Sequence, residues 1–138
     1  MKVKDIMTKT VISAYEDESI KEVVLRLRKN NIVGLPVLKK DGSLVGDFSE
    51  TDIIKLFPDI FAEAEDIPLV DIRELVAQPI KDVMNTETIV LFPDDSIKDA
   101  SKLMLEKFVH RIIIIDGNKI IGLISIGDVL KACSLMHG

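Results

Sequence analysis

Cysteine, aromatic residues and basic clusters are scarce in this chain, and each scarcity excludes a class of protein. Cys133 is the only cysteine, so no internal disulfide can form. Tryptophan is absent and aromatic residues make up only 4% of the chain, so the core has to be built from Ile, Val and Leu. The formal net charge of -5 and the lack of a long Lys/Arg cluster argue against a nucleic-acid-binding surface.

Long apolar runs and catalytic motifs are also missing. No apolar run approaches the roughly 18 residues that a membrane-spanning helix needs, and no apolar stretch typical of a secretion signal follows Met1. We therefore expect a cytoplasmic protein without a membrane partner. The sequence has no Gly-rich phosphate loop, no nucleophile elbow and no His/Cys spacing typical of zinc sites. We accordingly predict no catalytic residue, no metal site and no required cofactor.

What the sequence does contain is an internal duplication. The matching segments of the first and second copy are Lys4–Met7 with Lys81–Met84, Ser19–Glu22 with Ser96–Asp99, and Gly46–Asp52 with Gly122–Asp128. The first two pairs are 77 positions apart, and the third, after one deletion in a turn, is 76 positions apart. We therefore divide the chain into repeat 1 (1–57), a connector (58–79) and repeat 2 (80–138).

Both repeats predict the same order of elements, β-α-β-β-α. A short strand is expected around Val11–Ile12 or Ile89–Val90. The helix that follows begins after Ser19 or Ser96, each with an acid three residues later, which is typical of a capping box. Two β-rich runs and a final helix complete each repeat; they are 35–38, 44–49 and a helix from Glu50, and 111–115, 119–125 and a helix from Gly127. These elements predict an α+β fold.

Two further stretches carry specific expectations. The apolar positions Ile97, Ala100, Met104 and Phe108 are spaced to fall on one face of the second repeat's long helix. The connector contains three prolines and several acids, and a short helix capped by Asp71 is expected within it. We interpret the segment as a linker, and a lid or partner-binding segment is the alternative.

The polar residues with a possible binding role stand at the same place in both repeats. Ser49 and Ser125 each end a predicted strand, and Asp52 and Asp128 follow three residues later in the first turn of a helix. One interpretation is a helix N-cap, since Ser and Asp pair with exposed N–H groups there. The other is a ligand site, because helix N-termini attract phosphate and a carboxylate accepts both hydrogens of a ribose diol.

Several segments together resemble the CBS-pair family, also called the Bateman module. They are the two Lys-Asp-Ile/Val-Met segments, Gly34–Val37, Val109–Ile114 and the two Gly-x-x-Ser-x-x-Asp segments. The resemblance covers nearly the whole chain. It implies two β-α-β-β-α repeats packed through their sheets with pseudo-twofold symmetry, leaving two related clefts, and often a homodimer. It also implies an adenosine-containing ligand: AMP, ADP or ATP, or alternatively S-adenosylmethionine or another adenosyl compound.

The same resemblance implies roles for individual residues. Asp52 and Asp128 would hold ribose, with Ser49 and Ser125 near ribose or phosphate. The first cleft would combine Ser49 and Asp52 with Ile89, His110 and Arg111 of the opposite repeat; the second would combine Ser125 and Asp128 with Ile12. Because Val33-Gly34 replaces the His-Arg pair there, the first cleft is expected to favour phosphate. Asp47 departs from the pattern, since its counterpart, Leu123, is apolar. A carboxylate there would repel a phosphate, and the alternatives are that it points outward, or binds a metal or a base amino group.

We therefore expect a regulatory sensor of adenosine nucleotides that acts on an enzyme or transporter in trans, rather than an enzyme. The main alternative is a module for structure or interaction whose clefts have lost their ligand. A small nucleotide-converting enzyme is the least supported hypothesis, because no residue pattern in the sequence is typical of a catalytic site.

Overall fold

The computed structural model describes residues 1–61 and 72–137. The elements in chain order are η1 (Val3–Asp5), β1 (Ala14–Tyr15), α1 (Ile20–Lys29), β2 (Gly34–Leu38), β3 (Leu44–Ser49), α2 (Glu50–Phe61), α3 (Ile72–Ala77), η2 (Ile80–Asp82), β4 (Val90–Leu91), α4 (Ile97–Lys107), β5 (Arg111–Asp116), β6 (Lys119–Ser125) and α5 (Ile126–His137). The β-α-β-β-α order occurs twice, which confirms the predicted α+β fold class. Among the described helices, none has the length and apolarity to cross a membrane.

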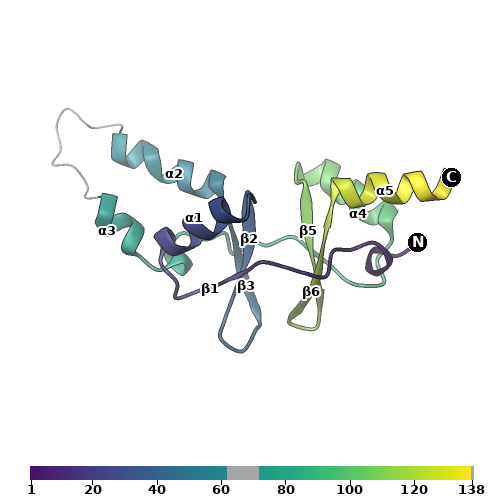
Figure 1. The fold of residues 1–138 in the computed structure, drawn as a ribbon, viewed down its shortest axis with the longest axis horizontal. Coiled ribbons are helices and arrows are strands. Elements are labelled where there is room, and N and C mark those ends of the chain that lie inside the picture. Colours follow the sequence, from purple (N-terminus) through teal and green to yellow (C-terminus); the bar gives the residue numbers. More distant parts are fainter. Residues whose placement is uncertain (62–71, 138) are drawn as a thin grey trace. The chain divides into compact units, whose positions relative to one another are not determined.

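Each repeat forms a three-stranded sheet of the same topology. β1 pairs with β2 in parallel and β2 with β3 antiparallel, and β4, β5 and β6 repeat this arrangement. Each sheet lies beside the helices of its own repeat (Figure 1). The two longer strands of each repeat begin and end within one residue of the predicted bounds.

The position predicted for the first short strand was wrong. Its pairing occurs at Ala14–Tyr15, opposite Val37 and Leu38, rather than around Val11–Ile12. In the second repeat the strand is Val90–Leu91, one residue later than predicted. The physical reason is that the chain passes from one compact unit to the other at Val11, so that pairing with β2 begins only beyond that point.

The compact units exchange their leading segments. One unit combines Met1–Val11 with Ile89–Gly138, and the other is Ile12–Thr88. Figure 1 shows the purple N-terminal segment beside the green and yellow second repeat. Backbone bonds hold each exchanged segment: Thr8 pairs with Leu123, at N···O distances of 2.8 and 2.9 Å, and Asn85 pairs with Asp47 at 2.9 Å in both directions. Each sheet is therefore completed by the opening segment of the other repeat.

The predicted helix caps and apolar faces are present. Ser19 Oγ accepts the Glu22 N–H at 3.1 Å, and Ser96 Oγ accepts the Asp99 N–H at 3.0 Å. One core cluster gathers apolar side chains of α1, β2 and β3, and the other gathers those of α4, β5 and β6. The fully buried members include Ile20, Val23, Leu27, Val37, Phe48, Ala100, Ile112, Ile114 and Ile124. As expected from the composition, the cores are almost wholly aliphatic.

Phe108 does not join this core. It caps the C-terminal end of α4 in the left-handed conformation, with φ of 55°, and the residue is 92% exposed. The equivalent residue of the first repeat, Asn31, has φ of 56°, and asparagine tolerates this conformation better than phenylalanine does. The turn after the helix thus takes the same backbone form in both repeats and directs the Phe108 side chain away from the apolar face.

In the connector, α3 (Ile72–Ala77) confirms the predicted short helix. Its proposed cap, Asp71, lies outside the described residues.

Two strand glycines accept the exchanged segments at close range. A Cβ added at Gly46 would lie 2.5 Å from the Asn85 carbonyl oxygen and 2.8 Å from Met84 Sδ. At Gly122 it would lie 2.6 Å from Met7 Sδ and 2.9 Å from the Thr8 carbonyl oxygen. The methionine of each Lys-Asp-Ile/Val-Met segment therefore packs on the glycine of the other repeat's Gly-x-x-Ser segment, which explains why both patterns occur twice.

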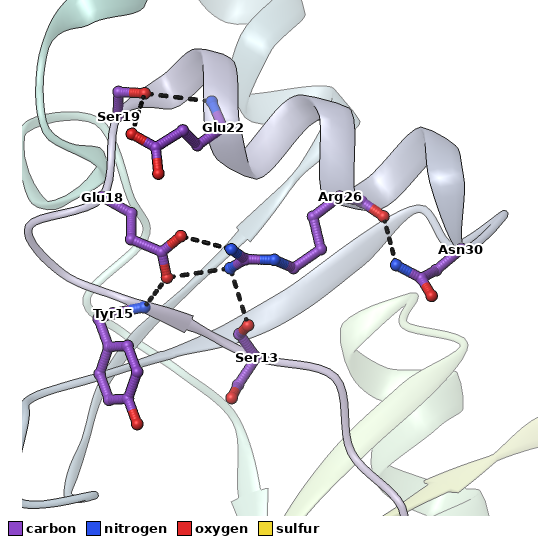
Figure 2. A network of polar contacts seen from close by, with 7 residues as sticks. All are labelled: Ser13, Tyr15, Glu18, Ser19, Glu22, Arg26 and Asn30. Carbon is purple, nitrogen blue, oxygen red and sulfur yellow. Dashed lines mark hydrogen bonds and ion pairs between the residues drawn. The ribbon is translucent and has the colours of Figure 1, made fainter.

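A polar network fixes the first short strand to the helix that follows it (Figure 2). The Arg26 guanidinium on α1 forms a two-point pair with the Glu18 carboxylate, with one Nη1···Oε1 distance of 3.0 Å, and donates to the Ser13 carbonyl at 3.1 Å. Glu18 Oε1 also accepts the Tyr15 N–H at 2.9 Å. The Arg26 hydrogen bonds lower the pKa of Glu18 below its usual value, against the opposing effect of burial. The second repeat has Leu103 in place of Arg26.

The glycine contacts predict a specific loss of stability. Gly46→Ala is expected to lower the free energy of unfolding by about 1–3 kcal/mol, because a backbone oxygen blocks the new methyl group and has to move. Chemical denaturation followed by circular dichroism measures the change. Gly127→Ala is the matched control, since its Cβ would meet nothing closer than Ser125 Oγ at 3.5 Å and alanine favours a helix. Equal losses in the two variants would contradict the close-contact explanation.

The Glu18–Arg26 pair predicts that wild type and Glu18→Gln differ in unfolding free energy by an amount that depends on pH. Glu18→Gln is expected to cost about 1 kcal/mol of unfolding free energy at neutral pH, since it removes a charge-assisted pair that is partly screened by solvent. Because the folded-state pKa is lowered, the wild-type advantage is complete above the unfolded value of about 4.3 and is lost as the pH falls through the folded value.

Urea unfolding at neutral and acidic pH tests this difference. Glu106→Gln is the control, because Glu106 lies 4.0 Å from Lys102 in an exposed pair and should contribute little at any pH. A Glu18→Gln deficit that stays constant down to about pH 3 would rule out the ion pair as its cause.

Candidate functional site

The first Ser-x-x-Asp pair lies where β3 meets α2. Ser49 is the last residue of the strand, and Asp52 lies in the first turn of the helix. Asp52 Oδ2 accepts the Ser49 backbone N–H at 2.9 Å and its hydroxyl at 3.2 Å. The Asp52 side chain is only 13% exposed, and Lys55 Nζ lies 3.8 Å from the other oxygen, Oδ1. The carboxylate is therefore held in one orientation by the fold.

The second pair repeats this geometry where β6 meets α5. Asp128 Oδ2 accepts the Ser125 N–H at 2.9 Å and its hydroxyl at 3.1 Å, and Ser125 Oγ lies 3.1 Å from the Asp128 N–H. These contacts form a reciprocal helix cap, so the capping interpretation is confirmed. In both pairs the cap uses Oδ2, which leaves the second carboxylate oxygen outside the cap. Capping and ligand binding are thus compatible roles for the same aspartate.

The His110-Arg111 pair lies beside Ser125. Arg111 is the cross-strand partner of Ser125, and the His110 carbonyl accepts the Ile126 N–H at 3.0 Å. Both side chains are exposed. In the other unit Gly34 faces Ser49 and the Val33 carbonyl accepts the Glu50 N–H at 2.9 Å, so the backbone is the same without the charge.

The two isoleucines predicted to line the clefts lie against the cores. Ile12 packs on the core of its unit, and the next residue, Ser13, is fixed by the Arg26 bond. Ile89 packs on the core of the other unit. Both are partly buried, so each can offer apolar surface to a ligand.

The predicted residues fall into two sets within the structure. Ile12, Ser49 and Asp52 belong to the unit Ile12–Thr88, and the remaining five belong to the other unit: Ile89, His110, Arg111, Ser125 and Asp128. Each Ser-x-x-Asp pair is brought together as predicted. Both predicted clefts combine residues of different units, and they remain predictions.

One polar cluster was not predicted from the sequence. Asp47 Oδ1 accepts hydrogen bonds from Asn85 Nδ2 at 3.0 Å and from Thr88 Oγ1 at 2.8 Å. Burial raises the pKa of Asp47, the hydrogen bonds from Thr88 and Asn85 oppose the rise, and the charge of Asp52 adds to it. The signal lay in comparing the repeats, because Leu123, Thr8 and Val11 occupy the matching positions.

Metal chemistry finds no support among the residues that the structure describes. No group of three or more His, Cys, Asp or Glu side chains there is arranged to hold an ion. The candidate residues are Ile12, Ser49 and Asp52 in one unit, and Ile89, Ser125, Asp128 and the exposed His110-Arg111 pair in the other.

Comparisons with known proteins identify a family and proteins of similar fold. A family model described as the CBS domain matches residues 3–59 and 80–135. The uncharacterized protein MJ1426 of Methanocaldococcus jannaschii is 36% identical over 157 aligned positions, covering 96% of this chain and 90% of that protein. Among solved structures, CBSX2 of Arabidopsis thaliana in complex with AMP has a TM-score of 0.81 and 24% identity, with coverage of 99% and 98%.

A second solved structure has a similar fold. The CBS domain pair of protein MJ0100, in complex with 5'-methylthioadenosine and S-adenosyl-L-methionine, has a TM-score of 0.75 and 23% identity, with coverage of 99% and 98%. Both likenesses concern the fold. Because the family model matches both repeats, and thereby most of the chain, the protein belongs to the CBS-domain family as a tandem pair of CBS repeats.

Proposed function

We propose that this protein is a regulatory sensor that binds an adenosine-containing compound in clefts between its two CBS repeats. The observation that carries the proposal is the duplicated Ser-x-x-Asp pair, in which the fold orients a carboxylate and leaves one of its oxygens outside the cap. Two proteins of similar fold support the ligand class, because CBSX2 is solved with AMP and MJ0100 with 5'-methylthioadenosine and S-adenosylmethionine.

The residue roles follow from the chemistry of a nucleoside. Asp52 and Asp128 are acceptors suited to the two hydroxyls of ribose, and the adjoining helix N-termini with Ser49 and Ser125 suit ribose or phosphate. Ile89 and Ile12 provide apolar surface for a base. In this proposal His110 and Arg111 of the other repeat complete the Asp52 cleft. The planar guanidinium of Arg111 suits phosphate because it can donate two parallel hydrogen bonds to it.

This distribution favours a phosphate-bearing ligand, such as AMP, ADP or ATP, in the Asp52 cleft. The Asp128 cleft, with Val33-Gly34 in place of the basic pair, suits a less charged adenosyl compound. Regulation would follow if ligand binds one arrangement of the repeats better than another, since a ligand shifts an equilibrium by its differential affinity. The signal would pass through a homodimer of the protein, or to an enzyme or transporter bound in trans. In this proposal the protein itself acts in the cytoplasm.

An alternative role is a module for structure or interaction that binds no nucleotide. The uncharged Val33-Gly34 segment and the carboxylate of Asp47 favour it, because both weaken a phosphate site. The two roles differ in whether any adenosyl compound stabilises the folded protein.

Thermal unfolding with AMP, ADP, ATP, S-adenosylmethionine and 5'-methylthioadenosine tests the proposal. A ligand at 100 times its Kd should stabilise the fold by about 2.7 kcal/mol, which is visible as a rise of the midpoint. Asp52→Asn and Arg111→Ala are expected to reduce the rise for phosphate-bearing ligands. Asparagine keeps one acceptor oxygen for the cap while it removes the charge, so the variant should remain folded.

The chain offers a matched control for the capping role. Asp99 also follows a capping serine by three residues at the start of α4, and it is exposed. Asp99→Asn should leave the ligand-induced rise intact. If none of the five compounds raises the wild-type midpoint, the sensor proposal loses its basis and the interaction module becomes the better account.

A further inference from the structure

The Asp47 side chain is not needed to build the fold. In the second repeat Leu123 stands in its place, yet the same antiparallel bridge forms between Leu123 and Thr8 through backbone atoms alone. The bridge between Asp47 and Asn85 has the same two backbone bonds. A partly buried carboxylate carries a desolvation cost that leucine avoids, so the presence of an acid calls for an explanation beyond strand pairing.

Asp47 is held in one orientation close to the proposed ribose site. It lies two residues before Ser49 on β3, so both side chains leave the same face of the sheet at a spacing of about 7 Å. The Asn85 amide and the Thr88 hydroxyl both donate to Oδ1, and these two hydrogen bonds restrict the orientation of the carboxylate. Neither of these bonds uses Oδ2, which keeps its capacity to accept a hydrogen bond.

Asp52 lies near enough to Asp47 for its charge to raise the pKa of Asp47, so a ligand held by Asp52 has the Asp47 carboxylate nearby. With ribose on Asp52, a base that extends along β3 reaches the position of Asp47, and Thr88 directly precedes Ile89, the residue expected to line the base. An ionised carboxylate only accepts hydrogen bonds. Adenine presents an amino group at its 6-position, which donates, whereas hypoxanthine and guanine present a carbonyl oxygen there, which a carboxylate repels.

We infer that Asp47 is a specificity-determining residue that accepts the 6-amino hydrogen of adenine and rejects 6-oxo purines in the site built on Ser49 and Asp52. The inference rests on the proposed function for the location of the ribose. The site built on Ser125 and Asp128, with Leu123 at the matching position, lacks this selection and should discriminate less between purines.

Asp47→Asn tests the inference through a reversal of preference. The asparagine oxygen can still accept from Asn85 and Thr88, while its amide NH2 replaces Oδ2 with a donor suited to a 6-oxo group. Calorimetric titration with AMP and IMP, and with adenosine and inosine, compares ligands that differ only at the 6-position. Using an Asp128→Asn background makes the titration report the Asp52 site.

The expected result is a preference for AMP over IMP of about tenfold or more in the parent protein, falling at least tenfold in Asp47→Asn, as for loss of one buried hydrogen bond. Taking the ratio within a pair cancels the effect of the altered charge on phosphate. Asp47→Leu, which copies the second repeat, should lose the preference without gaining affinity for IMP.

Each other outcome has a definite meaning. An unchanged AMP-to-IMP ratio in a folded Asp47→Asn protein overturns the inference and leaves Asp47 as a structural latch for the segment 85–88. Parent protein that binds neither member of either pair overturns the inference, and the proposed function falls with it if the five compounds of the thermal-unfolding test also fail to stabilise the wild type. The first failure appears only in the variant and the second already in the parent, so the two are distinguishable.

Discussion

The contact on which the rest of this structure depends is the docking of each repeat's opening segment on the sheet of the other repeat. A three-stranded sheet with a few helices buries little surface by itself. Here Met84 and Met7 cover Gly46 and Gly122, and a backbone bridge extends each sheet edge. Because each compact unit contains chain from both copies, neither repeat can complete its unit without the other. This requirement keeps glycine at one strand position and methionine at one leading position in both copies.

The same architecture determines what the candidate site residues can do. Each Ser-x-x-Asp segment directly follows a strand that the exchanged segment covers, so the aspartate begins its helix in a fixed orientation. The hydrogen bonds that cap the helix engage one carboxylate oxygen, and the chemistry proposed for the site needs the other. In the proposed function, folding and binding would therefore use different atoms of one side chain. A variant that removes the whole carboxylate changes both roles, whereas an Asp-to-Asn variant separates them.

Much of the fold and of the candidate site could be predicted from the sequence because each local pattern, although weak alone, occurs in both repeats. The strand order, the caps at Ser19 and Ser96 and the pairing of Asp52 with Ser49 are local patterns that the chain states twice. The exchange of leading segments could not be predicted, since it depends on contacts between residues far apart in sequence. The prediction that Phe108 lies on the apolar face was wrong, because helical periodicity applies only to residues within the helix. Phe108 lies just beyond α4, in a left-handed turn. The partners of Asp47 were missed because they come from the exchanged segment.

Where the copies differ, the backbone stays the same and the side chains carry the difference. The bridge at Asp47 and Asn85 matches the bridge at Leu123 and Thr8, and the turn at Asn31 matches the turn at Phe108. Arg26 ties the first short strand to its helix, whereas Leu103 stands at that position in the second copy. Backbone hydrogen bonds and close packing at glycine are thus sufficient for the fold, and these positions were free to diverge. The charge of Asp47 is not needed for the strand pairing that Leu123 makes equally well, and in the proposed function such a charge would give the two candidate sites different preferences.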